Sequence, residues 1–378
     1  HDSSIEAKEG TIDIDSVASH GSIVFYGNGA ELRDSKLEAD QIDIKGTSAK
    51  STVDTKHSFG ISIENTTLLG KSGIDLIGQP GHQEANGPNG ENVGGIRLYD
   101  SELTSSNGKL KLTGIGGSGT ILDDSEGIYV DETTLRASAI DLNGTGGKAA
   151  KPNLSDKSTG IRIRQSTLDT GSPALTLTTE ANGNIVLKGT GGSGKDDISG
   201  ISIVDGSTID SSGSIEITGQ GGFGDTLKNV NGVLITGEYP HTTITEGDTT
   251  IKANKAISIN GEGGLATKND ASVGVRIVHA EIESDQKVEI KGVGGTSTGT
   301  SIEEENHNGF MEGVTIWGST ITVNSSDTES SISNPYSATL IVDGSAGRSD
   351  GFVSSTSGVF LDNSTLKTDG VLHLKGSG

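Results

Sequence analysis

One repeated phrase runs through the chain and restricts its fold more than any other feature. The phrase begins with glycine, continues with two apolar residues separated by one residue, and ends in a short polar step that leads to Ser or Thr and then Ile or Leu. Clear copies span Gly60–Leu68, Gly95–Leu103, Gly127–Leu135 and Gly160–Leu168. Further copies begin at Gly200, Gly232, Gly274, Gly313 and Gly358.

A second phrase follows the first in each unit: two apolar residues separated by one residue, then any residue, then glycine. It reads Ile140–Gly144, Ile215–Gly219 and Val288–Gly292 in three of the units. A Gly-Gly pair follows in most copies. The starting glycines lie between 32 and 45 residues apart, and a weaker copy at Leu32–Gly46 brings the number of units to about ten. A period of this length indicates a solenoid, a propeller or another repeat array.

The pattern inside each unit predicts short strands rather than helices. Apolar and polar residues alternate with a period of two, and many of the apolar residues are β-branched. In the unit that begins at Gly127, we expect Ile128 and Val130, then Leu135, then Ile140 and Leu142 to point inward on three strands separated by bends. The polar residues between them, such as Asp131, would point outward.

Composition then favours a β-helix of stacked coils over a β-propeller. Aromatic residues make up only 3% of the chain, whereas glycine occupies 58 of its 378 positions. A four-stranded propeller blade fits the period but usually carries more aromatic residues and more regular unit lengths. Stacked coils bury a narrow core without large side chains. The sequence therefore predicts an all-β, right-handed parallel β-helix of about ten coils, with variable loops stacked along one edge, as one continuous domain over residues 1–378.

Charge and the apolar pattern exclude several kinds of partner. The formal net charge is −23, which disfavours nucleic acid and anionic lipid. No apolar run has the length of a membrane helix, so we expect no membrane insertion. The absence of cysteine excludes disulfides and thiolate chemistry.

The order of the motifs resembles a known family. The stretches Gly127–Gly147, Gly160–Leu168, Asn184–Gly194 and Gly200–Gly224 are similar to the repeat region of filamentous-haemagglutinin-type exoproteins, especially the large cyanobacterial ones exported by two-partner secretion. The resemblance implies an extracellular β-helix at the cell surface, an outer-membrane secretion partner and a role in adhesion. The Asn-Pro-Asn motifs of that family's secretion domain have no match, and we expect this chain to be a segment of a longer polypeptide.

The sequence gives little evidence for a catalytic site or a metal site. Glycoside hydrolysis needs two carboxylates roughly 5–9.5 Å apart. The densest acidic groups, Asp123-Asp124, Asp196-Asp197 and Glu303-Glu304-Glu305, lie beside glycines in predicted turns. Gly191–Ser199 fits the calcium-binding nonapeptide of β-rolls, but such sites need tandem copies and only one is present. We therefore expect no enzyme activity, no cofactor and no dedicated metal site, and leave weak calcium binding to the acidic loops open.

Three residues are the candidates for ligand contact, because aromatic rings stack on sugars: Tyr239, His241 and Trp317. The alternative for Trp317 is that it only covers an insertion. The favoured function is an adhesin stalk or adhesive rod that attaches to a glycan or protein on cells or surfaces. Two alternatives stay open, namely an assembly protein that builds a fibre, sheath or surface layer through lateral or end-to-end contacts, and a polysaccharide-processing enzyme.

Overall fold

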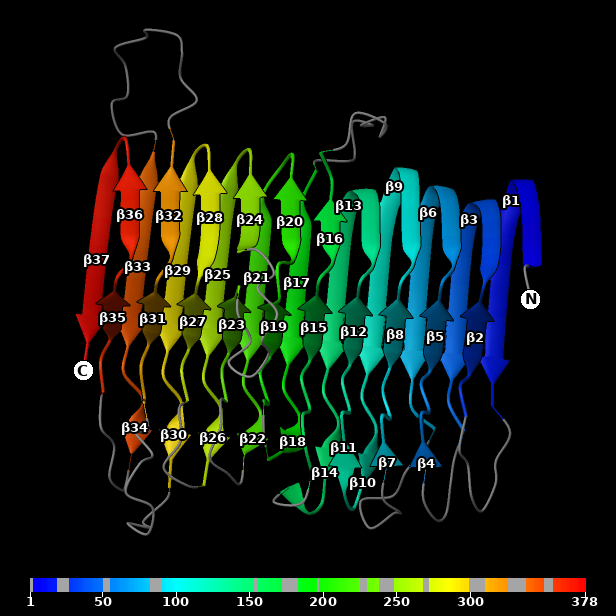
Figure 1. Cartoon of the computed structure of the whole chain (residues 1–378), viewed down its shortest axis with the longest axis horizontal. Helices are drawn as coiled ribbons and strands as arrows, with labels where there is room; N and C mark the ends of the chain where they lie inside the picture. The colour runs from blue at the N-terminus through cyan, green and yellow to red at the C-terminus, as the bar shows by residue number, and fades with distance from the viewer. Residues whose placement is uncertain are drawn as a thin grey trace, which may run out of the picture.

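The fold is a rod of stacked coils in which the two termini lie at opposite ends (Figure 1). The structure is a computed structural model that describes residues 3–18, 27–49, 55–81, 90–152, 155–171, 183–195, 197–224, 230–237, 248–267, 272–298, 310–324, 338–349 and 356–378. Every strand pairing within these residues is parallel, and none of these residues forms a helix, so no helix capable of crossing a membrane occurs among them. The predicted parallel β-helix is confirmed.

The largest sheet, called sheet A, has 17 strands and runs the length of the rod. Its first members are long strands, and later coils divide the same path into two shorter strands. The long strands are β1 (Ser3–Val17), β3 (Ser35–Thr47), β6 (Thr67–Gln79), β9 (Glu102–Ile115) and β13 (Thr134–Thr145). The divided strands are β16 (Thr167–Asp169), β17 (Ile185–Thr190), β20 (Thr208–Ser211), β21 (Ile215–Gln220), β24 (Thr249–Ala253), β25 (Ala256–Glu262), β28 (Ala280–Ser284), β29 (Lys287–Val293), β32 (Thr320–Val323), β33 (Thr339–Ser345), β36 (Thr365–Thr368) and β37 (Val371–Ser377).

The second sheet, called sheet B, has ten short strands, one for each coil. They are β2 (Ala30–Arg33), β5 (Ile61–Glu64), β8 (Ile96–Tyr99), β12 (Ile128–Asp131), β15 (Ile161–Arg164), β19 (Ile201–Val204), β23 (Val233–Thr236), β27 (Val275–Val278), β31 (Val314–Trp317) and β35 (Val359–Asp362). Each follows the starting glycine of one repeat. The expected number of about ten coils is thereby confirmed.

Two-residue strands stack along a third edge of the rod, where the sequence predicts the variable loops (Figure 1). They form sheets of three, two and five strands. The members are β4 (Thr55–Lys56), β7 (Gly90–Glu91) and β11 (Leu122–Asp123); β10 (Ser118–Gly119) and β14 (Lys148–Ala149); and β18 (Ser193–Gly194), β22 (Phe223–Gly224), β26 (Leu265–Ala266), β30 (Thr296–Ser297) and β34 (Arg348–Ser349). Much of the remaining length of these loops lies outside the described residues.

The core consists of aliphatic side chains that repeat from coil to coil. In the coil that begins at Gly127, the five residues expected to point inward are at most 1% exposed. Each stacks on its counterparts, because Ile128 lies opposite Ile161 and Ile96, and Leu142 lies opposite Leu187 and Leu112. Burial of such side chains contributes on the order of 1.5–3 kcal/mol each, so the rod needs no large aromatic residue inside.

Most coils turn from sheet B to sheet A at a residue with a left-handed backbone. The residues at this corner include Asn65 (φ 47°), Glu132 (φ 47°), His279 (φ 48°) and Asn363 (φ 45°). Asparagine and aspartate adopt this conformation more readily than most residues, and Asp34, Asp100 and Asp205 also occupy it. The polar step of the first phrase therefore forms the corner between sheet B and sheet A.

The glycine that closes the second phrase lies inside a strand and does not end it. Gly144 is buried in β13, which continues to Thr145. A Cβ at this position would lie 2.1 Å from the carbonyl oxygen of Gly160 in the next coil. Glycine is therefore required because the backbones approach closely, and the same clash occurs at Gly261 and Gly292.

Candidate functional site

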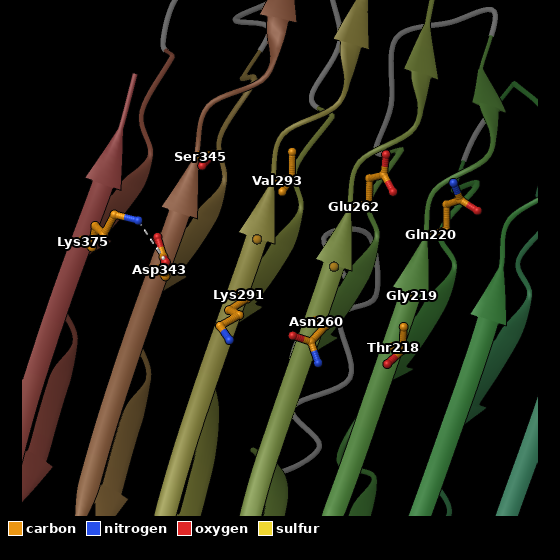
Figure 2. A pocket seen from close by; sticks show the side chains of 12 residues that line it. Thr218, Gly219, Gln220, Asn260, Glu262, Lys291, Val293, Asp343, Ser345 and Lys375 are labelled. Atoms are coloured by element: carbon orange, nitrogen blue, oxygen red, sulfur yellow. Dashed lines mark hydrogen bonds and ion pairs between the residues drawn. The ribbon is translucent and has the colours of Figure 1, made fainter.

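A groove on the outer face of sheet A is the candidate functional site (Figure 2). It crosses β21, β25, β29, β33 and β37 and has a volume of about 510 Å³, within the usual range for ligand sites. We call it the sheet A groove. It is lined by Thr218, Gly219, Gln220, Asn260, Gly261, Glu262, Lys291, Gly292, Val293, Asp343, Ser345 and Lys375.

The strand register arranges this lining into two columns with a backbone floor between them. Side chains two residues apart on a strand point to the same face. The first column is Thr218, Asn260, Lys291, Asp343 and Lys375, and the second is Gln220, Glu262, Val293 and Ser345. The intervening Gly219, Gly261 and Gly292 are buried, so only their backbone faces the groove.

Two lysines bring positive charge to the groove, and each is paired with a carboxylate. Lys375 lies 3.3 Å from Asp343. Lys291 contacts Glu289, which also accepts a 2.7 Å hydrogen bond from Lys287. The hydrogen bond to Glu289, together with its charge, raises the pKa of Lys291. Lys291 therefore stays fully charged at neutral pH, and both lysine side chains offer hydrogen-bond donors to the groove.

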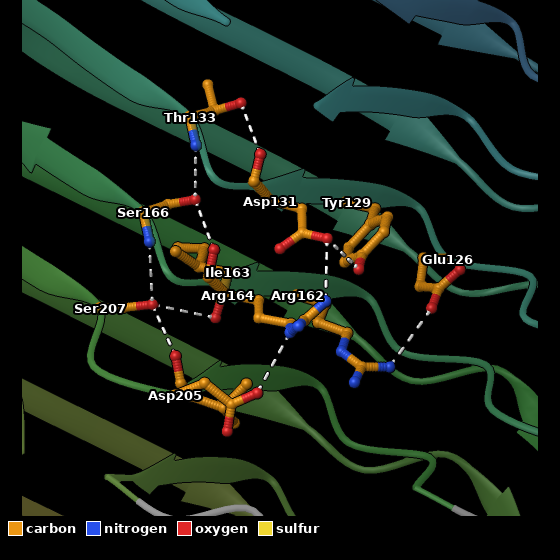
Figure 3. Close-up of polar contacts among 11 residues, drawn as sticks. Glu126, Tyr129, Asp131, Thr133, Arg162, Ile163, Arg164, Ser166, Asp205 and Ser207 are labelled. Atoms are coloured by element: carbon orange, nitrogen blue, oxygen red, sulfur yellow. Dashed lines mark hydrogen bonds and ion pairs between the residues drawn. The ribbon is translucent and has the colours of Figure 1, made fainter. Parts of the chain in front are cut away.

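A second polar cluster lies on the outer face of sheet B and is centred on Arg164 (Figure 3). Its guanidinium lies 3.1 Å from Asp131 and 3.2 Å from Asp205, on the coils before and after its own. Tyr129 donates a 2.7 Å hydrogen bond to Asp131, and burial followed by the Asp131 charge raises the pKa of Tyr129. Asp131 points outward as expected, yet it is only 3% exposed. The cluster therefore ties three coils together and presents little surface to a ligand.

Glu126 is a buried carboxyl beside this cluster. It is 4% exposed and lies 3.8 Å from Arg162, whose guanidinium sits 5.7 Å from the centre of the Tyr129 ring. Burial, reinforced by the charge of Asp124, raises the pKa of Glu126 to about 7 despite the opposing effect of Arg162. Such a pKa would suit a general acid, but the closed surroundings leave no access for a substrate. We interpret Glu126 as a structural residue.

Hydroxyl groups form a ladder behind the left-handed corners. The hydroxyl of Ser166 accepts a 3.1 Å hydrogen bond from the backbone N–H of Thr133 and donates a 2.6 Å bond to the Arg164 carbonyl. Ser101 and Ser319 make the same kind of double contact in other coils. The Ser or Thr of the first phrase is therefore a structural residue that satisfies backbone groups at the corner.

The three predicted ligand residues are not brought together by the described structure. Trp317 ends β31, is 43% exposed and lies 5.5 Å from the ring of His279, with the rings tilted by 52°. Tyr239 and His241 lie outside the described residues. The role of all three in ligand contact stays a prediction.

The acidic groups picked out in the sequence form no assembled site where they are described. Asp124 has a left-handed backbone (φ 49°) and lies 3.5 Å from Lys157, while Asp123 accepts a 3.1 Å hydrogen bond from the Asp156 N–H. Asp196 and the glutamates at 303–305 lie outside the described residues, as does part of the Gly191–Ser199 motif. Within the described ranges, no group of three or more His, Asp or Glu side chains is arranged to hold a metal ion.

The comparisons with known proteins give no relative. No family model, no curated protein and no solved structure matches the chain. The likeness to haemagglutinin-type repeats accordingly stays a prediction from the sequence, and the candidate site depends on its own geometry.

Proposed function

We propose that the chain is a secreted β-helical rod at the cell surface that mediates attachment to cells or surfaces, as an adhesin stalk or an adhesive rod. One observation carries the proposal: ten coils share a single core, while the outer face of sheet A carries side chains in register and a groove across five strands. Parallel pairing between successive coils suits a stiff spacer. Export through an outer-membrane partner belongs to the same proposal and rests on the resemblance.

Attachment can be tested with the whole chain coupled to fluorescent beads. The beads are incubated with intact cells of the source organism and with glass and polystyrene, next to beads that carry an unrelated protein of similar negative charge. We expect more retention of the rod-coated beads under flow. Equal retention of the two kinds of bead on all of these surfaces would contradict the proposal. Sugar release from added polysaccharide would contradict the expectation that the chain has no enzyme activity.

A further inference from the structure

We infer that the sheet A groove binds an uncharged, hydroxyl-rich polysaccharide chain, which lies across the strands and parallel to the rod axis. The inference names a ligand class for the proposed adhesive rod and rests on that function. The groove is open along its length (Figure 2), so it suits a stretch of a longer polymer better than a small enclosed molecule.

The shape of the groove carries the first part of the inference. Its floor is the backbone of buried glycines, and the exposed Val293 lies at its edge. Successive coils are about 4.8 Å apart, so five strands offer equivalent positions over roughly 19 Å. A sugar chain presents ring faces of C–H groups to such a floor and a row of hydroxyl groups to the rims.

The chemistry of the rims favours hydroxyl groups over a peptide backbone. Thr218, Gln220, Asn260 and Ser345 supply uncharged donors and acceptors on both columns. Strands β21, β25, β29 and β33 each pair with a neighbour on both sides. Their backbone groups are therefore engaged in the sheet, and an extended peptide cannot join it by strand addition.

The charges of the groove and of the whole chain favour binding of neutral polysaccharides over acidic ones. Lys291 and Lys375 are matched inside the groove by Glu262 and Asp343, so its lining has no net charge. The chain as a whole carries a formal charge of −23, which repels polyanions over distances of about a Debye length. An uncharged polymer escapes this repulsion.

Binding of defined polysaccharides to the whole chain tests the inference. The probes are laminarin, mannan, xylan and dextran as neutral polymers and polygalacturonate as an acidic one, measured by affinity electrophoresis and calorimetry at physiological salt. The test variant Gln220→Ala/Asn260→Ala removes one rim group from each column. The matched control Asn143→Ala/Thr145→Ala changes the same two columns on β13, outside the groove.

We expect at least one neutral polymer to bind, and the test variant to weaken binding about five- to hundredfold, as the loss of two hydrogen bonds would. The control variant should bind like the native chain. Binding of polygalacturonate alone, equal loss in both variants, or no binding of any neutral probe would overturn the inference. Bead attachment without polysaccharide binding would refute the groove's role and leave the adhesive rod standing. Polysaccharide binding without bead attachment would refute the adhesive rod alone.

Discussion

Replacing Gly144 by alanine should destabilise the rod strongly, although the change adds a single methyl group to a small residue. The added Cβ would lie 2.1 Å from the Gly160 carbonyl oxygen and 2.7 Å from Cγ1 of Ile161. That oxygen accepts a 3.0 Å hydrogen bond from the N–H of Ile128. The methyl group can be placed only if the next coil moves away by about 1 Å, and a close-packed interior resists such a shift.

The expected loss in the free energy of unfolding is the sum of two costs. Overpacking a tight interior costs about 1–3 kcal/mol, and a buried N–H that loses its acceptor costs about 1–3 kcal/mol. We expect Gly144→Ala to lower the free energy of unfolding by about 3–5 kcal/mol. Gly376 is the matched control, because it occupies the same column and an added Cβ there meets its nearest atom, Val359 N, at 3.2 Å. Gly376→Ala should cost less than about 1 kcal/mol.

Urea unfolding followed by circular dichroism measures the total loss. Because a solenoid can open locally, hydrogen exchange of peptides from β12 to β17 should also be measured, and it should accelerate in Gly144→Ala alone. A loss below about 1 kcal/mol, or equal losses in the two variants, would refute the close-approach explanation.

Three further predictions concern polar groups. Ser166→Ala should cost about 1–3 kcal/mol in urea unfolding, since the buried N–H of Thr133 loses its acceptor. Burial raises the pKa of Glu126 from 4.5 to about 7, so its ionisation opposes folding as pH rises through this window. Between pH 5 and pH 8 the free energy of unfolding of the native chain should therefore fall by about 2–3 kcal/mol more than that of Glu126→Gln. Parallel plots of unfolding free energy against pH for the two proteins would contradict this. Arg164→Met should cost about 3 kcal/mol by removing the positive charge that neutralises the buried carboxylate of Asp131, whereas Lys375→Met, at an exposed pair, should change stability by less than about 1 kcal/mol.

The alternation of apolar and polar residues was sufficient to predict the fold. A period of two within each phrase assigns Ile128, Val130 and Leu142 to the inside, and the repeat places equivalent residues above them. The closing glycine was harder to interpret, since a sequence shows a glycine without showing what lies near it. In the sequence Gly144 is only the last residue of the second phrase, whereas the structure explains this glycine by the close approach of a carbonyl oxygen from the next coil. The strand β1 has no clear repeat phrase and was not predicted.

The candidate groove could not be predicted in the same way, because it depends on the register between coils. Asn260 and Lys291 are 31 positions apart in the chain and become neighbours only when β25 pairs with β29. Residue type alone indicates Tyr239, His241 and Trp317 as ligand residues. A signal was available: aligning the second phrases on their glycines places Thr218, Asn260 and Lys291 in one column.

The two large sheets have different roles in the rod, and they differ in how deeply their outward-pointing side chains are buried. On sheet B, Asp131 and Leu234 point away from the core yet are at most 5% exposed, so the central strands of this face serve cohesion between coils. On sheet A, Gln220 and Lys291 point outward and are exposed. Because inward side chains fix the coil and these outward side chains carry little of its stability, the columns of sheet A can vary without loss of the fold. A repeat protein can therefore acquire or change a binding specificity on this face while its core stays the same.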